Sequence, residues 1–70
     1  MHTSQQYHAA LELLAQGAVI EETRPAPQAF CLRLAKQRVP FPASLVQQLL
    51  GQGRIQLRCR VSGLNTYTGT

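Results

Sequence analysis

Arginines are the residues of this chain whose type and spacing best suit contact with a partner. Three of them, Arg54, Arg58 and Arg60, are separated by even numbers of positions near the C-terminal end. A guanidinium donates two parallel hydrogen bonds to a phosphate or a carboxylate, and it stays charged at neutral pH. Alternate residues of a strand share a face, so these side chains are expected to form one basic stripe. The spacing therefore indicates an anionic partner.

The remaining basic residues strengthen this expectation. Arg33, Lys36 and Arg38 are expected to extend the stripe. All three acidic residues precede Thr23 and all seven basic residues follow it, so residues 1–23 carry −3 and residues 24–70 carry +7. Phosphate contacts made by such a surface give binding that is independent of sequence and sensitive to salt. The alternative is a solvated basic face that discourages aggregation at a sheet edge.

Two glutamines are the candidates for reading a base sequence. Gln47 and Gln48, with Ser44, lie on the polar side of a short predicted helix. Glutamine can bond to adenine through two hydrogen bonds in the major groove. The helix carries no basic residue, so we expect it to contribute mainly packing and modest specificity.

Metal binding is not expected. His2, His8, Cys31 and Cys59 provide the donor types of a zinc site, but the two cysteines lie far apart in the sequence and do not have the C-x2–4-C spacing that such sites use. We therefore expect no metal and no cofactor.

Catalysis is not expected either. The chain has no aspartate, and its one pair of neighbouring carboxylates is Glu21 and Glu22. Consecutive residues of a strand point to opposite faces, so these two cannot share a site. No glycine-rich phosphate-binding motif occurs. The sequence therefore predicts a protein that is not an enzyme.

The elements that must position these residues follow from apolar periodicity and from glycine and proline. A stripe of spacing three and four predicts a helix over 4–16 that Gly17 ends. Strict alternation predicts strands over 29–37 and 54–61. The other expected elements are a short strand over 18–23, a proline loop over 24–28, an extended link over 39–42, a helix over 42–51 that Gly51 and Gly53 end, a turn over 62–65 and a return strand over 66–68. The first two strands are expected to pair as an antiparallel hairpin.

The alternation over 54–61 assigns each side chain to a face. Ile55, Leu57, Cys59 and Val61 are expected on the core face, opposite the arginines. Cys59 is then a small core residue. Cys31 shares a face with Arg33, and an exposed face around Cys31 is one alternative surface for dimerisation.

The expected fold is α+β in the order α-β-β-α-β-β, with the helices packed on a small antiparallel sheet. Residues 1–70 form one domain, with a leader over 1–3 and a frayed end over 69–70. A chain of this length buries only about 60% of its unfolded surface, so a homodimer or another partner is expected to complete the core.

Two segments carry a family resemblance. LELLAQGAVI (11–20), SLVQQLLGQGRIQ (44–56) and the basic hairpin after them resemble compact winged-helix domains of bacteria and their phages, of the YjhX type. The resemblance covers residues 10–61. It implies a winged-helix-like fold whose last helix and wing form the binding surface.

Two hypotheses of function follow. The first is a small DNA-binding regulator of phage or mobile-element type, active in transcription regulation, that holds the phosphate backbone through an arginine-rich wing. The alternative is a protein-interaction module or inhibitor that binds an acidic or nucleic-acid-binding surface of a host protein.

The start, MHTSQQYH, lacks the basic and apolar regions of a signal peptide, and no apolar run is long enough to span a bilayer. A cytoplasmic protein with no membrane partner is expected.

Overall fold

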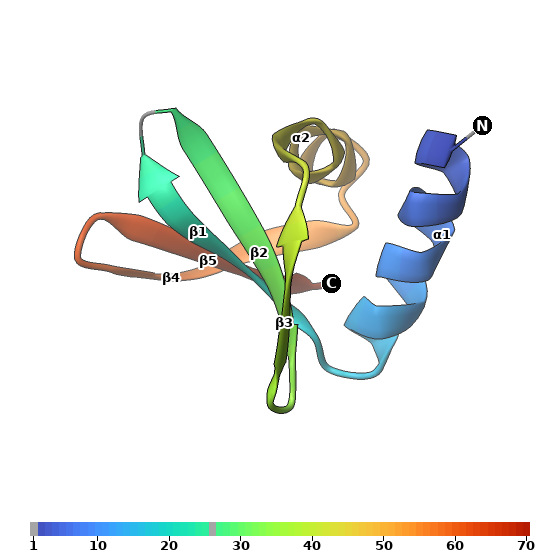
Figure 1. Ribbon diagram of the computed structural model, residues 1–70, viewed down its shortest axis with the longest axis horizontal. Helices are drawn as coiled ribbons and strands as arrows, with labels where there is room; N and C mark the ends of the chain where they lie inside the picture. Colours follow the sequence, from blue (N-terminus) through green and yellow to red (C-terminus); the bar gives the residue numbers. More distant parts are fainter. Residues whose placement is uncertain (1, 26) are drawn as a thin grey trace.

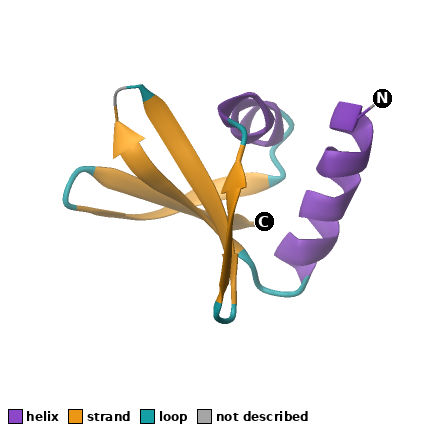
Figure 2. Cartoon of the chain, viewed as in Figure 1, coloured by secondary structure: helices purple, strands orange, loops and turns teal. Residues whose placement is uncertain are grey.

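The computed structural model describes residues 2–25 and 27–70, which form two helices on one face of a five-stranded antiparallel sheet (Figure 1). The elements are α1 (His2–Ala15), β1 (Val19–Pro25), β2 (Gln28–Leu34), β3 (Gln37–Phe41), α2 (Ala43–Gly51), β4 (Ile55–Val61) and β5 (Leu64–Gly69). The strand order is β3-β2-β1-β5-β4, so β1 is central and β3 and β4 are the two edges. Figure 2 shows the helices gathered on one side of the strands. The expected α+β class, with helices on an antiparallel sheet, is confirmed.

The expected element order was wrong by one strand. The chain runs α-β-β-β-α-β-β, because the segment taken as an extended link is β3. The long strand expected over 29–37 ends at Leu34, and β3 pairs with β2 from Leu34↔Gln37 to Phe30↔Phe41. Pro40 lies inside β3, opposite Cys31. A proline lacks the N–H that a central strand needs, but an edge strand tolerates it.

Both helices end where the glycines predict. Ala18 N–H donates to Leu13 O at 3.0 Å beyond Gly17, whose φ is 103°. Gly53, with φ 71°, has the same position after α2. This is the Schellman arrangement, in which a left-handed residue lets the chain satisfy the last free carbonyls of the helix. The helix ends are therefore encoded locally, within a few residues.

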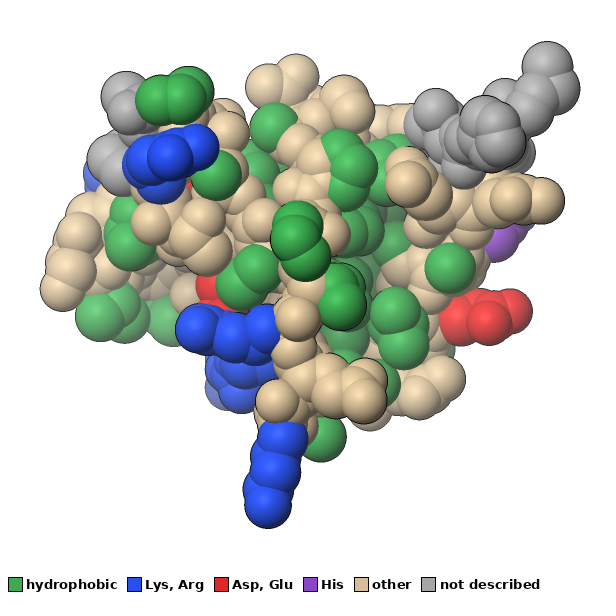
Figure 3. Space-filling model, viewed as in Figure 1, with side chains coloured by type: hydrophobic (Ala, Val, Ile, Leu, Met, Phe, Trp, Pro, Cys, Tyr) green, Lys and Arg blue, Asp and Glu red, His purple; other side chains and the backbone are tan. Residues whose placement is uncertain are grey.

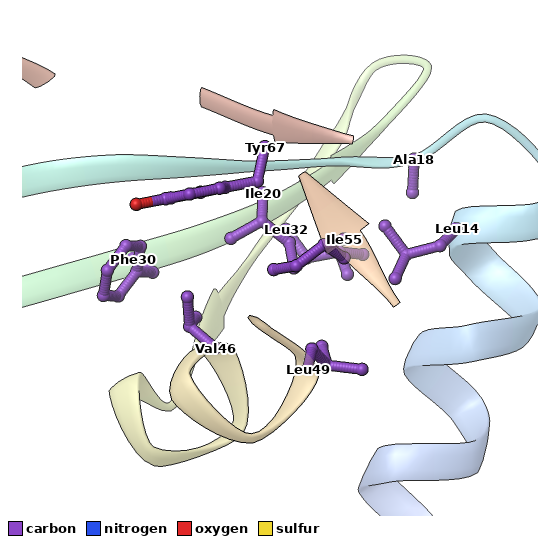
Figure 4. Packing of buried hydrophobic residues seen from close by; sticks show 9 residues of the cluster. All are labelled: Leu14, Ala18, Ile20, Phe30, Leu32, Val46, Leu49, Ile55 and Tyr67. Atoms are coloured by element: carbon purple, nitrogen blue, oxygen red, sulfur yellow. The ribbon is translucent and has the colours of Figure 1, made fainter. Parts of the chain in front are cut away.

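The core lies between the sheet and the two helices, and Figure 4 shows its side chains pointing toward one another. Ile20 of β1 is completely buried. It pairs with Leu32 of β2 on one side and with Tyr67 of β5 on the other, so the three side chains share the covered face. The rest of this cluster is Leu14, Ala18, Phe30, Val46, Leu49 and Ile55. Complete burial of a side chain such as Ile20 contributes about 1.5–3 kcal/mol.

The two chain ends are part of the fold. Gly69 belongs to β5, and Thr70 N–H donates to Arg54 O at 3.1 Å. The Thr70 hydroxyl also donates to Gly53 O at 3.0 Å. The end expected to fray over 69–70 is thus fastened to the start of β4, and α1 begins at His2, inside the expected leader. Neither helix of the described residues is long and apolar enough to cross a membrane.

Candidate functional site

β4 is an edge strand that is exposed along almost all of its length. Ile55 is buried, and every residue from Gln56 to Val61 is exposed. The β4–β5 hairpin extends to the left in Figure 1, away from both helices, so no helix covers its outer half. Leu57 and Val61 keep 55% and 63% of their surface exposed, although the alternation placed both in the core. Sequence reasoning missed these two apolar side chains as part of a surface.

A bulge in β4 changes which side chains share a face. Leu57 pairs with Tyr67, and the next pair is Cys59 with Thr66, so Arg58 is an extra residue without a direct partner. One extra residue shifts the period of a strand and moves the following side chains to the other face.

The bulge overturns the predicted basic stripe. Beyond it, Arg60 lies on the face that carries the core, whereas Cys59 and Val61 lie on the uncovered face. Arg54, Arg58 and Arg60 therefore do not share one face. The residues RIQLRCRV alternate without interruption, so the sequence contains no signal for this bulge.

Among the described residues, Arg54, Arg58 and Arg60 form no ion pair, because both ion pairs of the structure use Glu21. Figure 3 shows acidic atoms at the right, basic side chains at the left and at the lower tip, and a smaller acidic patch beside the central basic side chains. The basic charge of β4 is therefore available to a partner.

Glu21 neutralises part of the second predicted basic group. Its carboxylate accepts a hydrogen bond from Arg33 Nε at 3.2 Å and from Arg38 Nη2 at 3.0 Å. These side chains meet on the uncovered face, because Glu21 lies opposite Cys31 in β1 and β2, and Arg33 lies opposite Arg38 in β2 and β3. Hydrogen bonds from Arg38 and then Arg33 lower the pKa of Glu21. The cluster carries +1 rather than the +2 of two unpaired arginines.

Lys36 and the two glutamines lie apart from this cluster. Lys36 is exposed in the tight turn between β2 and β3. Gln47 and Gln48 are exposed on α2, with Ser44 also exposed. The other side of α2 buries Leu45, Val46 and Leu49. The exposed residues of α2 are uncharged and include the apolar Leu50, and the helix packs on the sheet as expected.

The two cysteines exchange their predicted environments. Cys31 is buried, with Sγ 3.9 Å from Glu21 Oε1, and Cys59 is exposed on β4. The prediction of Cys59 as a core residue was wrong because of the bulge. The alternative of an exposed face around Cys31 was wrong as well. Within residues 2–25 and 27–70, no group of three or more His, Cys, Asp or Glu side chains is placed to hold a metal ion.

Glu22 has a structural role that the sequence did not reveal. It is buried, with 8% of its surface exposed. Its carboxylate accepts the backbone N–H of Asn65 at 3.1 Å and Nε2 of Gln28 at 3.0 Å. Glu22 and Glu21 point to opposite faces, as the strand geometry required. Glu22 thereby fastens the β4–β5 hairpin to β1, which positions β4.

A hollow of about 520 Å³ lies on the uncovered face of the sheet. Arg38 of β3 and Glu21 of β1 line one part of it, and Val61 and Leu64 of the β4–β5 hairpin line another. The Glu21 cluster and the apolar end of β4 thus border a common concave surface.

Comparison with models of protein families, with curated proteins and with solved structures gives no match to this chain.

Proposed function

We propose that the protein is a non-enzymatic interaction module that binds an acidic surface of another protein through β4. The observation that carries this proposal is the composition of the exposed edge, where Arg58 and Arg60, which form no ion pair with the described residues, lie between the exposed side chains of Leu57 and Val61. Arginine is enriched where proteins meet, whereas lysine is depleted. Six of the seven basic residues of the chain are arginine.

The two kinds of side chain have separate tasks in this proposal. Arg58 and Arg60 steer an acidic surface toward β4 and bond to its carboxylates. Leu57 and Val61 lose contact with water when the partner covers them. Since each is already partly covered, this burial contributes about 1 kcal/mol for each side chain.

A DNA-binding regulator is the second candidate, and the uneven distribution of charge supports it. Residues 24–70 carry +7, and the arginines of β4 form no ion pair in the described part of the chain. Phosphates would bind there without regard to sequence, with Gln47 and Gln48 as the available base contacts. The resemblance of the sequence to winged-helix domains of bacteria and phages also favours this candidate. Two observations weaken it. α2 has no basic residue, and the order of helices and strands along the chain differs from the one expected for that family.

A binding comparison separates the two candidates. The probes are a fluorescent peptide that mixes glutamate with valine and duplex DNA, and the variants are Leu57→Ser and the double change Arg58→Gln, Arg60→Gln. Arg24→Gln is the matched control, because Arg24 is exposed but lies outside β4. We expect the double variant to weaken both probes and Leu57→Ser to weaken the peptide alone, by about fivefold for a loss of about 1 kcal/mol. If Leu57→Ser leaves peptide binding unchanged, the protein-binding proposal fails and the DNA candidate takes its place.

A further inference from the structure

We infer that β4 receives an acidic, extended segment of its partner as a sixth strand of the sheet. This inference rests on the proposed function and adds how the partner is held. Main-chain hydrogen bonds to a free sheet edge provide affinity in such complexes, and side chains provide specificity. Three features of β4 support it: its backbone, its charge and its exposed apolar residues.

The backbone of Leu57 faces away from the sheet. Thr70 N–H donates to Arg54 O at 3.1 Å, so these residues form a hydrogen-bonded pair. In an antiparallel ladder such pairs alternate with pairs that exchange no hydrogen bond. The Arg54–Thr70 pair is followed by Ile55–Gly69, Gln56–Thr68 and Leu57–Tyr67. Leu57 and Tyr67 therefore exchange no hydrogen bond with each other. The N–H and C=O of Leu57 therefore point toward the open edge.

The backbone of Arg60 faces the same way beyond the bulge. Ser62 and Gly63 have φ values of 53° and 78°, which is the pattern of a tight two-residue hairpin turn. The pair that closes such a turn, Val61–Leu64, is hydrogen-bonded, so the next pair, Arg60–Asn65, is not. Asn65 N–H is consequently directed to β1, where it reaches the Glu22 carboxylate at 3.1 Å. Leu57 and Arg60 thus offer two outward backbone sites on either side of the bulge.

Charge complementarity selects the occupant. Arg58 and Arg60 lie at the outward backbone sites and make no ion pair in the residues that the structure describes. A second copy of β4 would bring two more arginines to the same edge, so like charge opposes self-pairing. A strand with glutamate or aspartate side chains instead places carboxylates opposite these guanidinium groups. Nucleic acid offers the charge but has no peptide groups for Leu57 and Arg60.

The exposed apolar residues indicate the rest of the segment. Leu57 lies on the same face of the sheet as Tyr67, which is the face that carries the core, and Val61 lies on the uncovered face. An added strand presents side chains to both faces and covers one residue on each. The other edge, β3, is less suitable, because Pro40 lacks an N–H and because the chain passes directly from Phe41 into α2. The segment expected at β4 therefore combines acidic and β-branched residues on both faces of its strand.

Amide hydrogen exchange measured by NMR tests the inference on the unmodified protein. The probe is a short peptide that carries glutamate together with valine or threonine on each face of its strand, and its control is the same peptide with N-methyl groups at alternate residues. At a peptide concentration of about ten times the Kd, the first peptide should slow exchange at the amides of Leu57 and Arg60 about tenfold. The reason is that these amides then exchange only in the protein molecules that are free of peptide. The methylated peptide has the same charge but cannot complete the ladder, so it should bind more weakly and leave both amides unchanged.

Two outcomes overturn the inference, and they differ in what they imply for the proposed function. If both peptides bind equally and neither slows the two amides, strand addition is wrong and binding to acidic surfaces stands. If neither peptide binds while duplex DNA does, both are wrong. A pair of variants provides a second measurement. Leu57→Pro removes an outward N–H that the sheet does not use and should abolish binding of the first peptide, whereas Leu57→Thr keeps this N–H and should retain most of it.

Discussion

Removal of the Glu21 charge should increase the positive charge that the uncovered face offers to a polyanion. In Glu21→Gln, Arg33 and Arg38 lose the carboxylate that holds them at 3.2 and 3.0 Å. Both guanidinium groups are already partly exposed, with 44% and 63% of their side chains accessible. They can therefore reach an added anion without any change of the backbone.

The magnitude follows from counterion release. Each phosphate contact of a duplex adds about 0.9 to the slope of log K against log salt, so two freed arginines steepen the slope by up to about 1.8. Over a fourfold rise in salt this corresponds to an additional loss of affinity of about twelvefold. The fold itself should lose little stability, because exposed ion pairs contribute little.

Fluorescence anisotropy of labelled duplex DNA between 50 and 200 mM salt, used here as a calibrated polyanion, measures the slope. Glu12→Gln is the matched control, because it changes the net charge by the same amount from an exposed position on α1. We expect a clearly steeper slope for Glu21→Gln than for Glu12→Gln. Equal slopes for the two variants would show that Arg33 and Arg38 do not belong to the binding surface.

The same carboxylate should make stability depend on pH. Its hydrogen bonds to Arg38 and Arg33 lower the pKa of Glu21 below the ordinary value of 4.5. A carboxyl with a lowered pKa in the folded state stabilises the fold above its unfolded pKa, and this contribution is lost as the pH falls through the folded value. Urea unfolding from pH 7 to pH 3 should show this loss in the wild type and a smaller one in Glu21→Gln. Identical pH profiles would contradict the ion-pair cluster.

Three further predictions concern the fold. Ala35 has φ 55° in the β2–β3 turn, so Ala35→Gly should stabilise the protein by about 1 kcal/mol in urea unfolding; a loss of stability would refute the left-handed conformation. Ile20→Ala should cost about 2–5 kcal/mol, a large share of the total for a chain of this length, and a cost below about 1 kcal/mol would argue against its complete burial. Cys59 should react with a thiol reagent at once and Cys31 only on unfolding, which mass spectrometry of the labelled peptides can verify; equal rates would contradict the exchanged environments.

The parts of the structure that depend on neighbouring residues were predictable. The apolar stripes and the glycines at 17 and 53 located both helices to within about two residues. The proline loop located the β1–β2 hairpin, whose strands pair as expected. These features are local, because a helix period and a left-handed glycine act over a single turn of chain.

The sequence did not predict β3, because whether this segment can form a strand depends on its position in the sheet. Pro40 excludes a central strand, and no local feature shows that this segment lies at an edge. Once the order β3-β2-β1-β5-β4 is known, the same proline is compatible with a strand. The missing strand also changed the family expectation, because the expected winged-helix order had two strands before its second helix.

The candidate site shows the same division. The sequence by itself determined that the acidic residues come first, that arginine dominates the basic residues, and that residues 54–61 form a strand. Tertiary structure decided that β4 lies at an edge beyond both helices, that Arg58 is an extra residue and that Glu21 holds Arg33 and Arg38. The physical reason is that strand neighbours, register and ion pairs join residues far apart in the chain. Alternation within one strand carries no information about what lies opposite it.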